Sequence, residues 1–416
     1  MRQGMPDNDE IRNSDIVVVS QQPWDTDIGS TCKNIAEEFS KKNRVLYVNN
    51  ALDRRAWLKE RADPKVQKRI AVIRGKEKGL VSIKENLWNL YPDCIAESVN
   101  WIKIRPVFNA LNKRNNRLFA RSIQKAMDEL GFKNVILFND NDIFRPFYLK
   151  EFLKPIISVY LFRDVMLGVD YWKFHGKKLE PALIAKSDVV VTNTEYIARY
   201  CRQFNPQSYR VGQGCNLDLF RIPENKVIPP DMASIPRPVI GYVGALVSLR
   251  LDVEILAHIA AQRPQWSIVL VGPEDEVFRN SRLHHMNNVH FLGTKKPGEL
   301  PAYINTFDVC LNPQVINETT IGNYPLKIDE YLALGKPVVA TKTDGMSIFE
   351  EDTYLAETKE QYVSLIEQAL RDDNEALQKK RRTVALSHSW ENMVKAIYRV
   401  INNFLESKKN DASNME

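Results

Sequence analysis

Two charged side chains three positions apart, Lys327 and Glu330, open a short helical stretch in the second half of this 416-residue chain. Residues three apart lie on one face of a helix. Pro325 suits the first helical turn, because its missing N–H would be unpaired there anyway. A helix that begins beside the carboxyl ends of parallel strands is a ready anion site. The pair could therefore bind a phosphate and two vicinal hydroxyls, or form an ordinary surface ion pair.

The elements that must position this pair are short apolar runs closed by glycine or proline, which predict buried parallel strands. They are Pro238–Gly244, Ser267–Gly272, Asn288–Gly293, Asp308–Pro313 and Pro337–Thr341. Helix-length segments separate and follow them, at Asp252–Gln262, Pro297–Asn305, Tyr324–Leu334 and Glu360–Leu377. Strands that alternate with helices predict a doubly wound α/β domain, which we place at residues 239–387.

The first half of the chain alternates in the same way and predicts a second Rossmann-like domain over residues 14–220. The expected strands are Asp15–Val19, Arg44–Val48, Arg69–Ile73, Asn134–Phe138, Ile156–Leu161 and Asp188–Thr192, and the expected helices are Ser30–Lys42, Phe108–Leu130 and Glu195–Gln203. Five prolines between Ile222 and Pro238 predict a linker over residues 221–238. Apolar residues at helical spacing predict a C-terminal helix over 388–407, ahead of a charged, disordered tail at 408–416.

Three segments of the second half carry a family resemblance: PLKIDEYLALGKPVVAT (325–341), IGYVGALVSLRLDVEIL (240–256) and VLVGPEDEV (269–277). They resemble the donor-binding domain of GT-B glycosyltransferases of the "group 1", family-4-like superfamily, and within it the teichuronic-acid-type subset. The resemblance covers nearly the whole chain. It implies an α/β protein with two Rossmann-like domains facing a cleft and a C-terminal helix that crosses back.

In that family the helix lysine contacts the donor diphosphate and the helix glutamate holds the ribose hydroxyls, which implies these roles for Lys327 and Glu330. Gly244 would let the backbone approach the donor, and Arg250 would be a second diphosphate ligand. The alternative for Arg250 is a salt bridge to Asp252 or Glu254.

The donor sugar has less obvious partners. The wider group has an acidic residue eight positions before the helix glutamate, where this chain has Gly322. Glu318, with Asn317 beside it, is the nearest substitute, and Asn323 completes the predicted donor-binding set.

Candidates for the acceptor side follow strands of the first domain. A carboxylate there could remove the proton of an acceptor hydroxyl. Asp164 ranks first as this base, ahead of Asp25 and Asp27; the alternatives are a structural pair with Arg163 and a helix-capping loop. The other acceptor-side candidates are Gly29, Asp140, Asp142 and Arg163 itself.

Charge is distributed unevenly along the chain. Residues 1–220 contain 36 Lys and Arg against 26 Asp and Glu, whereas residues 221–416 contain 22 against 26. Trp101–Met127 combines seven basic residues with aromatic and aliphatic ones and has no acid. Such a segment could lie on an anionic membrane, or it could be a basic helix that faces the core. The acidic second half argues against nucleic acid as a partner.

Together these features predict a glycosyltransferase, hexosyltransferase-like, that moves a sugar from a UDP- or GDP-linked donor to a glycan or lipid-linked glycan acceptor in cell-surface polysaccharide assembly. A nucleotide-sugar epimerase on the same fold and a non-catalytic transferase-like binding subunit are the alternatives. No Asp-x-Asp pair lies where the donor would bind, so neither a metal nor a cofactor is expected. A polar N-terminus, five scattered cysteines and no long apolar run predict a cytoplasmic protein that could associate peripherally with the inner face of the membrane.

Overall fold

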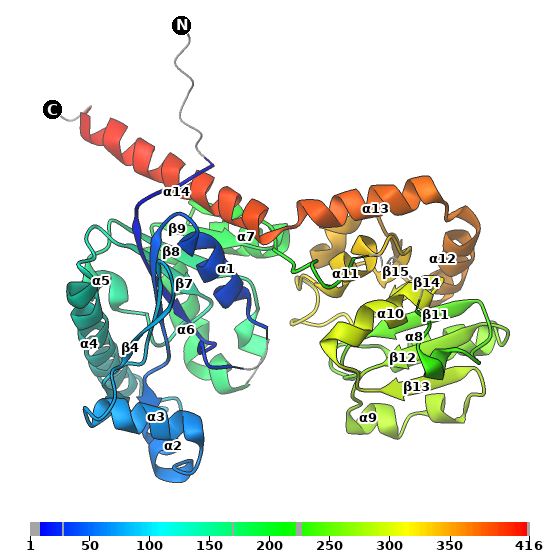
Figure 1. Cartoon of the computed structure of the whole chain (residues 1–416), viewed down its shortest axis with the longest axis horizontal. Coiled ribbons are helices and arrows are strands. Elements are labelled where there is room, and N and C mark those ends of the chain that lie inside the picture. The colour runs from blue at the N-terminus through cyan, green and yellow to red at the C-terminus, as the bar shows by residue number, and fades with distance from the viewer. Residues whose placement is uncertain (1–8, 27–28, 169, 222–226, 414–416) are drawn as a thin grey trace, which may run out of the picture. The chain divides into compact units, whose positions relative to one another are not determined.

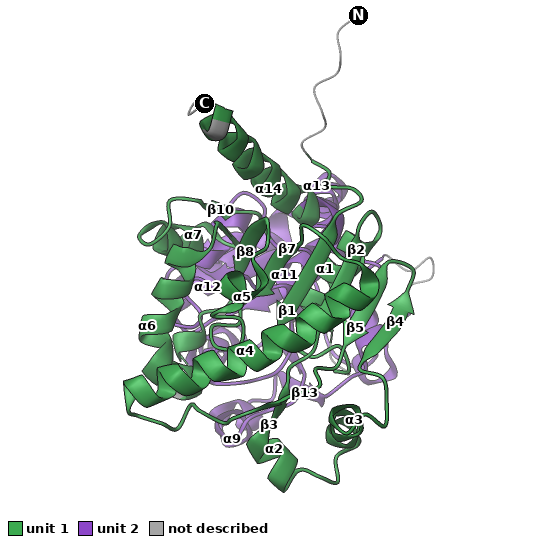
Figure 2. Cartoon of the chain, turned by 90° about the vertical axis from the view of Figure 1, so that its left-hand side faces the viewer, with its two compact units in different colours: residues 1–212, 393–416 green, residues 213–392 purple. Residues whose placement is uncertain are grey.

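The structure is a computed structural model that describes residues 9–26, 29–168, 170–221 and 227–413. The chain forms two compact units, one of residues 1–212 with 393–416 and the other of residues 213–392 (Figures 1 and 2). Each unit is built around one mainly parallel sheet. The α/β architecture predicted for both halves is confirmed, and the C-terminal segment returns to unit 1 as expected.

The sheet of unit 1 has the order β10-β9-β8-β7-β1-β2-β5-β4, in which only β4 runs antiparallel to its neighbour. Its strands are β1 (Asp15–Ser20), β2 (Arg44–Val48), β4 (Leu80–Lys84), β5 (Leu87–Leu90), β7 (Ile136–Asp140), β8 (Ile157–Phe162), β9 (Val189–Thr192) and β10 (Ser208–Arg210). The strand order reverses at β1, which lies between β2 and β7, and Ser20 pairs with Asp140 at its carboxyl end. Such reversal points are where doubly wound sheets bind ligands.

Helices cover both faces of this sheet. Phe119 and Ile123 of α4 (Arg105–Leu130) pack in one cluster with Val17 of β1. On the opposite face, Phe39 of α1 (Thr31–Ser40) meets Phe138 edge-on at 5.3 Å and stacks on Tyr398 of α14 (Trp390–Ser413) at 5.5 Å. The remaining elements are β3 (Leu52–Asp53), paired with β6 (Ile95–Ala96), and the helices α2 (Arg54–Lys59), α3 (Pro64–Ile73), α5 (Leu149–Leu153), η1 (Met166–Gly168), α6 (Asp170–Lys186) and α7 (Glu195–Arg202).

Unit 2 contains a fully parallel sheet of order β13-β12-β11-β14-β15-β16 (Figure 1). Its strands are β11 (Val239–Val243), β12 (Ser267–Val271), β13 (Val289–Gly293), β14 (Val309–Asn312), β15 (Val338–Thr341) and β16 (Tyr354–Ala356). One face is covered by α10 (Leu300–Thr306), α11 (Lys327–Ala333) and α13 (Glu375–Ser387), and the other by α8 (Val253–Gln262) and α12 (Lys359–Asp372). The order reverses at β11, between β12 and β14. The short helices are η2 (Pro230–Met232), α9 (Glu276–Arg279), η3 (Arg282–His285), η4 (Pro297–Glu299) and η5 (Asp344–Phe349).

Four predicted elements differ in the structure. Residues Arg69–Ile73 end α3 instead of forming a strand, because Asp63 caps that helix and Pro64 opens it. The single helix expected over Glu360–Leu377 is two helices, since Asn374 caps a new one. The helix expected from Tyr324 begins only at Lys327. Residues 408–413 continue α14, so the prediction of a disordered tail is wrong for them.

The unit boundary also differs from the predicted one at residue 220. Residues 213–220 pack with unit 2: the Cys215 N–H donates to the His388 carbonyl at 2.9 Å, and Phe220 lies in the unit 2 core. Gly214 lies so close to Trp390 that a Cβ would come within 2.3 Å of its ring. Within the predicted linker, Met232 is buried in the same core, while residues 222–226 lie outside the described residues.

Candidate functional site

Two glycines shape the loops at the reversal point of unit 2. Gly244, directly after β11, has a φ of +139°, and Gly272, directly after β12, has a φ of +151°. A Cβ on Gly272 would lie 2.0 Å from the Gly244 carbonyl oxygen, and one on Gly244 would lie 3.0 Å from the Lys327 Nζ. Only glycine fits at both positions, and the result is a backbone loop that lies directly against the Lys327 ammonium.

The short helix α11 carries the predicted lysine–glutamate pair. Its residues Ile328, Tyr331 and Leu332 are fully buried against the sheet. The Tyr331 hydroxyl also accepts a hydrogen bond of 2.9 Å from the Val243 N–H, at the end of β11. With only seven residues and no side-chain cap, α11 presents its ligand groups through side chains rather than through a helix N-terminus.

Lys327 and Glu330 are half-buried, and each has a perturbed pKa. Burial, helped by the positive charge of Arg250, lowers the pKa of Lys327 to about 8, while Glu330 opposes the shift. Burial raises the pKa of Glu330 to about 7, with Lys327 opposing. Lys327 donates to the Tyr242 hydroxyl and its Nζ lies 4.1 Å from that ring's centroid. Among the described residues, Lys327 and Glu330 form no ion pair with each other or with any other group, so the surface ion pair considered as an alternative is not formed.

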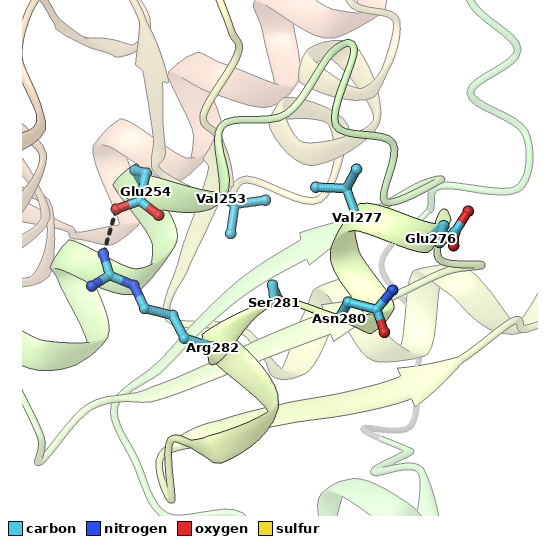
Figure 3. Close-up of a pocket in the computed structure, with 7 residues that line it drawn as sticks. All are labelled: Val253, Glu254, Glu276, Val277, Asn280, Ser281 and Arg282. Carbon is cyan, nitrogen blue, oxygen red and sulfur yellow. Dashed lines mark hydrogen bonds and ion pairs between the residues drawn. The ribbon is translucent and has the colours of Figure 1, made fainter.

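Arg250 lies on the loop after β11 with an exposed side chain. Its carbonyl accepts from the Val315 N–H at 3.0 Å, which fixes the loop to the segment after β14. The predicted alternative partners are engaged elsewhere: Asp252 caps α8, and Glu254 pairs with Arg282 beside an open pocket of about 620 Å³ (Figure 3). Within the part of the chain that the structure describes, the Arg250 guanidinium makes no hydrogen bond or ion pair.

The loop between β14 and α11 carries the other predicted donor ligands. The Asn317 side chain holds this loop together, because its Nδ2 donates to the Leu249 carbonyl at 2.8 Å and its Oδ1 accepts from the Thr319 N–H at 2.9 Å. Glu318 is exposed, and its carboxylate has no partner among the described residues. Asn323 is half-buried, and its N–H donates to the Thr320 carbonyl at 3.2 Å.

A buried network that the sequence did not indicate supports α11 from behind. Asp329 is fully buried and accepts hydrogen bonds from the Tyr324 hydroxyl at 2.8 Å and from the His388 ring at 2.7 Å. Burial raises the pKa of Asp329, and His388 and Tyr324 oppose the shift. The network fixes the residue next to Glu330. Its only sequence signal was one acidic residue, Asp329, among the apolar residues of the buried face of α11.

At the reversal point of unit 1, the structure brings together three of the acceptor-side candidates. Asp140 is fully buried; it accepts from the Ser20 hydroxyl at 3.0 Å and from the Arg163 Nε at 2.8 Å. The same guanidinium also pairs with Asp164, whose side chain is 47% exposed. The structural pair considered for Asp164 is therefore present, and it leaves the carboxylate accessible to solvent. Asn141, at a φ of +55°, accepts from the Arg163 N–H at 2.9 Å and fixes the backbone here.

The other acceptor-side candidates make no hydrogen bond or ion pair with Arg163 or Asp164 among the described residues. Asp25 receives two hydrogen bonds from the Arg69 guanidinium, at 2.9 and 3.0 Å. Burial would raise the pKa of Asp25, but Arg69 holds it below its usual range. Asp142 is buried and closes a turn by accepting from the Phe144 N–H at 2.9 Å. Gly29 is exposed, and Asp27 lies outside the described residues.

The described residues contain no group of three or more His, Cys, Asp or Glu side chains that could hold a metal ion. None of the helices formed by these residues is long and apolar enough to cross a membrane.

Comparison with known proteins supports the family and the fold. Residues 237–372 match the family model described as glycosyl transferases group 1. One curated relative is TuaH of Bacillus subtilis, which is named as a teichuronic acid biosynthesis glycosyltransferase. It is 26% identical to this chain over 230 residues, which cover 51% of this chain and 56% of TuaH. The chain thus spans about half the length of this curated relative.

Among solved structures, sucrose-phosphate synthase from Thermosynechococcus elongatus is similar with a TM-score of 0.64 and 16% identity, covering 95% of this chain and all of that one. HepE of Anabaena, solved in complex with UDP, is similar with a TM-score of 0.57 and 15% identity, covering 96% and 100% of the two chains. These structures share the fold, and the predicted fold is confirmed.

Proposed function

We propose that this group 1 glycosyltransferase of GT-B fold transfers a sugar from a UDP- or GDP-linked donor to a glycan or lipid-linked glycan in cell-surface polysaccharide assembly. The observation that carries the proposal is the Lys327–Glu330 pair beside Gly244. Both side chains are half-buried and ionisable, and within the described structure no opposite charge neutralises either at ion-pair distance. Leaving such buried groups without an opposite charge or a hydrogen-bond donor is costly. The diphosphate of a nucleotide would supply the missing charge for Lys327, and its ribose hydroxyls would donate to Glu330.

The donor end of the reaction requires positive charge at the diphosphate, because the leaving group gains negative charge as the anomeric C–O bond breaks. Lys327 and Arg250 supply two cations there, and preorganised charge of this kind stabilises the transition state. In this proposal Glu330 accepts hydrogen bonds from the ribose hydroxyls, and Glu318 and Asn323 contact the sugar. We propose that these two cations perform the reaction without a metal or a cofactor.

At the acceptor end, Asp164 takes the proton of the acceptor hydroxyl while the new C–O bond forms. Arg163 holds this carboxylate in place and is itself fixed by buried Asp140. Asp164 is the best placed of the described candidates, because Asp25 is engaged by Arg69 on both oxygens. The base therefore comes from the loop after β8.

A nucleotide screen by thermal shift tests the donor assignment. A ligand present at 100 times its dissociation constant stabilises the protein by about 2.7 kcal/mol, so UDP or GDP should raise the melting temperature and CMP should not. Turnover of the donor sugar that requires an acceptor would then separate transfer from the epimerase and from a non-catalytic subunit. Failure of both UDP and GDP to stabilise the protein would contradict the proposal.

We also propose that the enzyme is cytoplasmic and docks peripherally on the anionic inner face of the membrane. Most apolar residues of α4 face the core, as expected for the alternative of a basic, core-facing helix. At its N-terminal end, however, Ile104 and Val107 are 65% and 44% exposed, beside exposed Lys103 and Arg105. Basic residues around exposed apolar ones suit an anionic surface.

Co-sedimentation with liposomes tests this docking. The protein should bind anionic vesicles at low salt, and neither neutral vesicles nor anionic ones at high salt. Replacing Arg114, Arg117 and Arg121 with Gln should reduce binding. Unchanged sedimentation of that variant would refute the role of α4.

A further inference from the structure

Unit 1 contains an open pocket of about 540 Å³. Five stretches of chain form its wall: the segments after β2 and β5, one side of α4, the turn after β7 and the start of α6. Its volume is typical of small-ligand sites, which measure about 300–1,000 Å³. None of the acceptor-side residues predicted from the sequence lines it, so it is a further candidate site on unit 1.

The carboxylates in the wall of this pocket are already engaged by the protein. Asp53 accepts hydrogen bonds from the Arg55 N–H at 2.8 Å and from the Ser98 hydroxyl at 2.6 Å. Glu97 is held by the Arg54 guanidinium through two hydrogen bonds of 2.7 and 2.6 Å. Both acids therefore serve to fix the wall, and the charge of Glu97 is compensated by Arg54.

The arginines in the wall are less committed. The exposed guanidinium of Arg55 makes no hydrogen bond or ion pair with any residue that the structure describes. Arg145 pairs with Asp142 through its Nε alone, at 3.1 Å. Burial raises the pKa of Tyr171, with Asp53 and Asp142 adding to the shift and Arg145 and Arg55 opposing it, so charges of both signs lie near its hydroxyl. The guanidinium of Arg55 is therefore the cationic group of the wall that remains available to a ligand.

Flat aromatic surfaces line the same pocket. Trp172 stacks on Phe144 with ring centroids 4.9 Å apart, and Tyr171 meets Trp172 edge-on at 4.8 Å. The residues Tyr171 and Trp101 are 61% and 75% exposed. Rigid aromatic rings offer large apolar contact area at a low entropy cost, and the C–H face of a pyranose ring is a natural partner for them.

The start of α6 is held firmly, so these rings are in place before a ligand arrives. His175 stacks on Phe108 of α4 at 3.5 Å, and its Nε2 lies 2.8 Å from the Ile102 carbonyl oxygen. Gly176 allows close packing, since a Cβ there would lie 2.5 Å from Leu167. A preformed site loses less free energy on binding than a flexible one.

From these observations we propose that the pocket binds an anionic sugar residue of the acceptor glycan. Arg55 pairs with the carboxylate or phosphate of that residue, since a guanidinium suits both groups, and Tyr171 packs against the ring. The proposal rests on the transferase function in naming the ligand as part of the acceptor. It adds the chemical class of that acceptor, which is negatively charged.

Binding measured by calorimetry on the full chain tests the site. The probes are a glucuronate-containing tetrasaccharide, its carboxyl-reduced neutral counterpart and glucose 1-phosphate. One or both charged probes should bind the native protein. We expect Arg55→Gln to lower the affinity for such a probe by about 10- to 150-fold, as for loss of a charge-assisted hydrogen bond. The neutral tetrasaccharide should bind weakly and equally to both proteins. Arg61→Gln, which changes a nearby arginine outside the pocket wall, is the matched control.

The two charged probes separate the sources of the anionic group, since the tetrasaccharide reports a uronate and glucose 1-phosphate a sugar phosphate. The proposal is overturned if neither charged probe binds the native protein, or if the Arg55→Gln and Arg61→Gln variants bind the charged probe with the same affinity. UDP affinity, measured on the same samples, should be unchanged in both variants. Loss of UDP binding in the native protein would count against the transferase function, and the tetrasaccharide result would still decide the pocket.

Discussion

The carboxyl edges of the two sheets arrange their charges in opposite ways. In unit 1 the acids at this edge are paired: Asp140 lies between Ser20 and Arg163, and Asp25 is bound twice by Arg69. In unit 2, Lys327 has a neutral tyrosine as its partner, and within the described residues the side chains of Arg250 and Glu330 have none. Both edges occupy the same topological position, at the strand-order reversal of a parallel sheet.

The difference indicates a structural role for the paired charges of unit 1 and a ligand-binding role for the unpaired charges of unit 2. A paired buried charge is satisfied by the protein, and removing one partner leaves the other unpaired. An unpaired, partly buried charge shifts its pKa toward the neutral form, as Lys327 and Glu330 both do. The edge of unit 2 is thus prepared for a charged ligand, while the edge of unit 1 holds the accessible carboxylate of Asp164 in a fixed place.

The largest effect on activity is expected at Asp164. Asp164→Asn keeps the shape and removes the proton acceptor, so turnover should fall about 10²- to 10⁴-fold while UDP affinity stays unchanged. Asp25→Asn should instead leave Arg69 unpaired and lower the free energy of unfolding by about 3 kcal/mol, with turnover per folded molecule retained. Steady-state kinetics and urea denaturation measure the two effects. If Asp164→Asn remains active and folded Asp25→Asn does not, the base lies in the first loop.

The unpaired charges of unit 2 are tested by affinity rather than turnover. Lys327→Ala and Glu330→Gln each remove a charge-assisted hydrogen bond to the nucleotide, worth roughly 1.5–3 kcal/mol. Affinity for UDP or GDP should therefore fall about 10- to 150-fold by calorimetry. Lys342→Ala, which breaks an exposed pair with Glu357 in the same unit, should change nothing. Native affinity in both site variants would mean that the donor binds elsewhere.

The same contrast predicts a pH dependence of nucleotide affinity. The Lys327 ammonium is lost above a pKa of about 8, and the Glu330 carboxylate is protonated below a pKa of about 7. A diphosphate favours the charged lysine, so binding takes up protons at alkaline pH and weakens up to about tenfold per pH unit. Ribose hydroxyls favour the ionised glutamate, so affinity also falls on the acid side.

Two variants separate the limbs of this profile. Lys327→Arg should remove the alkaline limb because a guanidinium stays charged throughout, and Glu330→Gln should flatten the acid limb down to the titration of the nucleotide itself. Affinity that is constant from pH 6 to pH 9 in the native protein would contradict both assignments.

The smallest expected effect concerns the donor sugar. Glu318 is exposed on the loop before α11, so Glu318→Gln should weaken binding of the intact nucleotide sugar only about 2- to 10-fold, as for one ordinary hydrogen bond. Affinity for the free nucleotide should not change. An equal loss for nucleotide and nucleotide sugar would place Glu318 on the nucleotide instead.

Local signals made most of this architecture predictable. Lys327 and Glu330 are three residues apart, so their shared face follows from helix geometry alone. Strands β11 to β15 of unit 2 were recognisable because glycine or proline bounds each apolar run, whereas the short β16 was not predicted. The segment Arg69–Ile73 shows the limit, since its apolar run suggested a strand although Asp63 and Pro64 mark a helix start just before it.

What the sequence could not supply were contacts between distant positions. Asp25 and Arg69 are 44 residues apart, and Asp329 and His388 are 59 apart. No local pattern marks such pairs, and the pocket of unit 1 combines five separate segments. Side chains at these places are fixed by tertiary packing, which only the structure reveals.

Because the ribosome makes the chain from its N-terminus, helix α14 reaches unit 1 late in synthesis. Tyr398 stacks on Phe39, its hydroxyl accepts from the Asn43 side chain at 2.9 Å, and Arg399 pairs with Asp9. During synthesis, residues 213–392 must be made before this cover exists, which takes about 10–40 seconds at roughly 5–20 residues per second. The nascent first unit therefore emerges with its α1 surface bare, and it becomes complete only after unit 2 has been made.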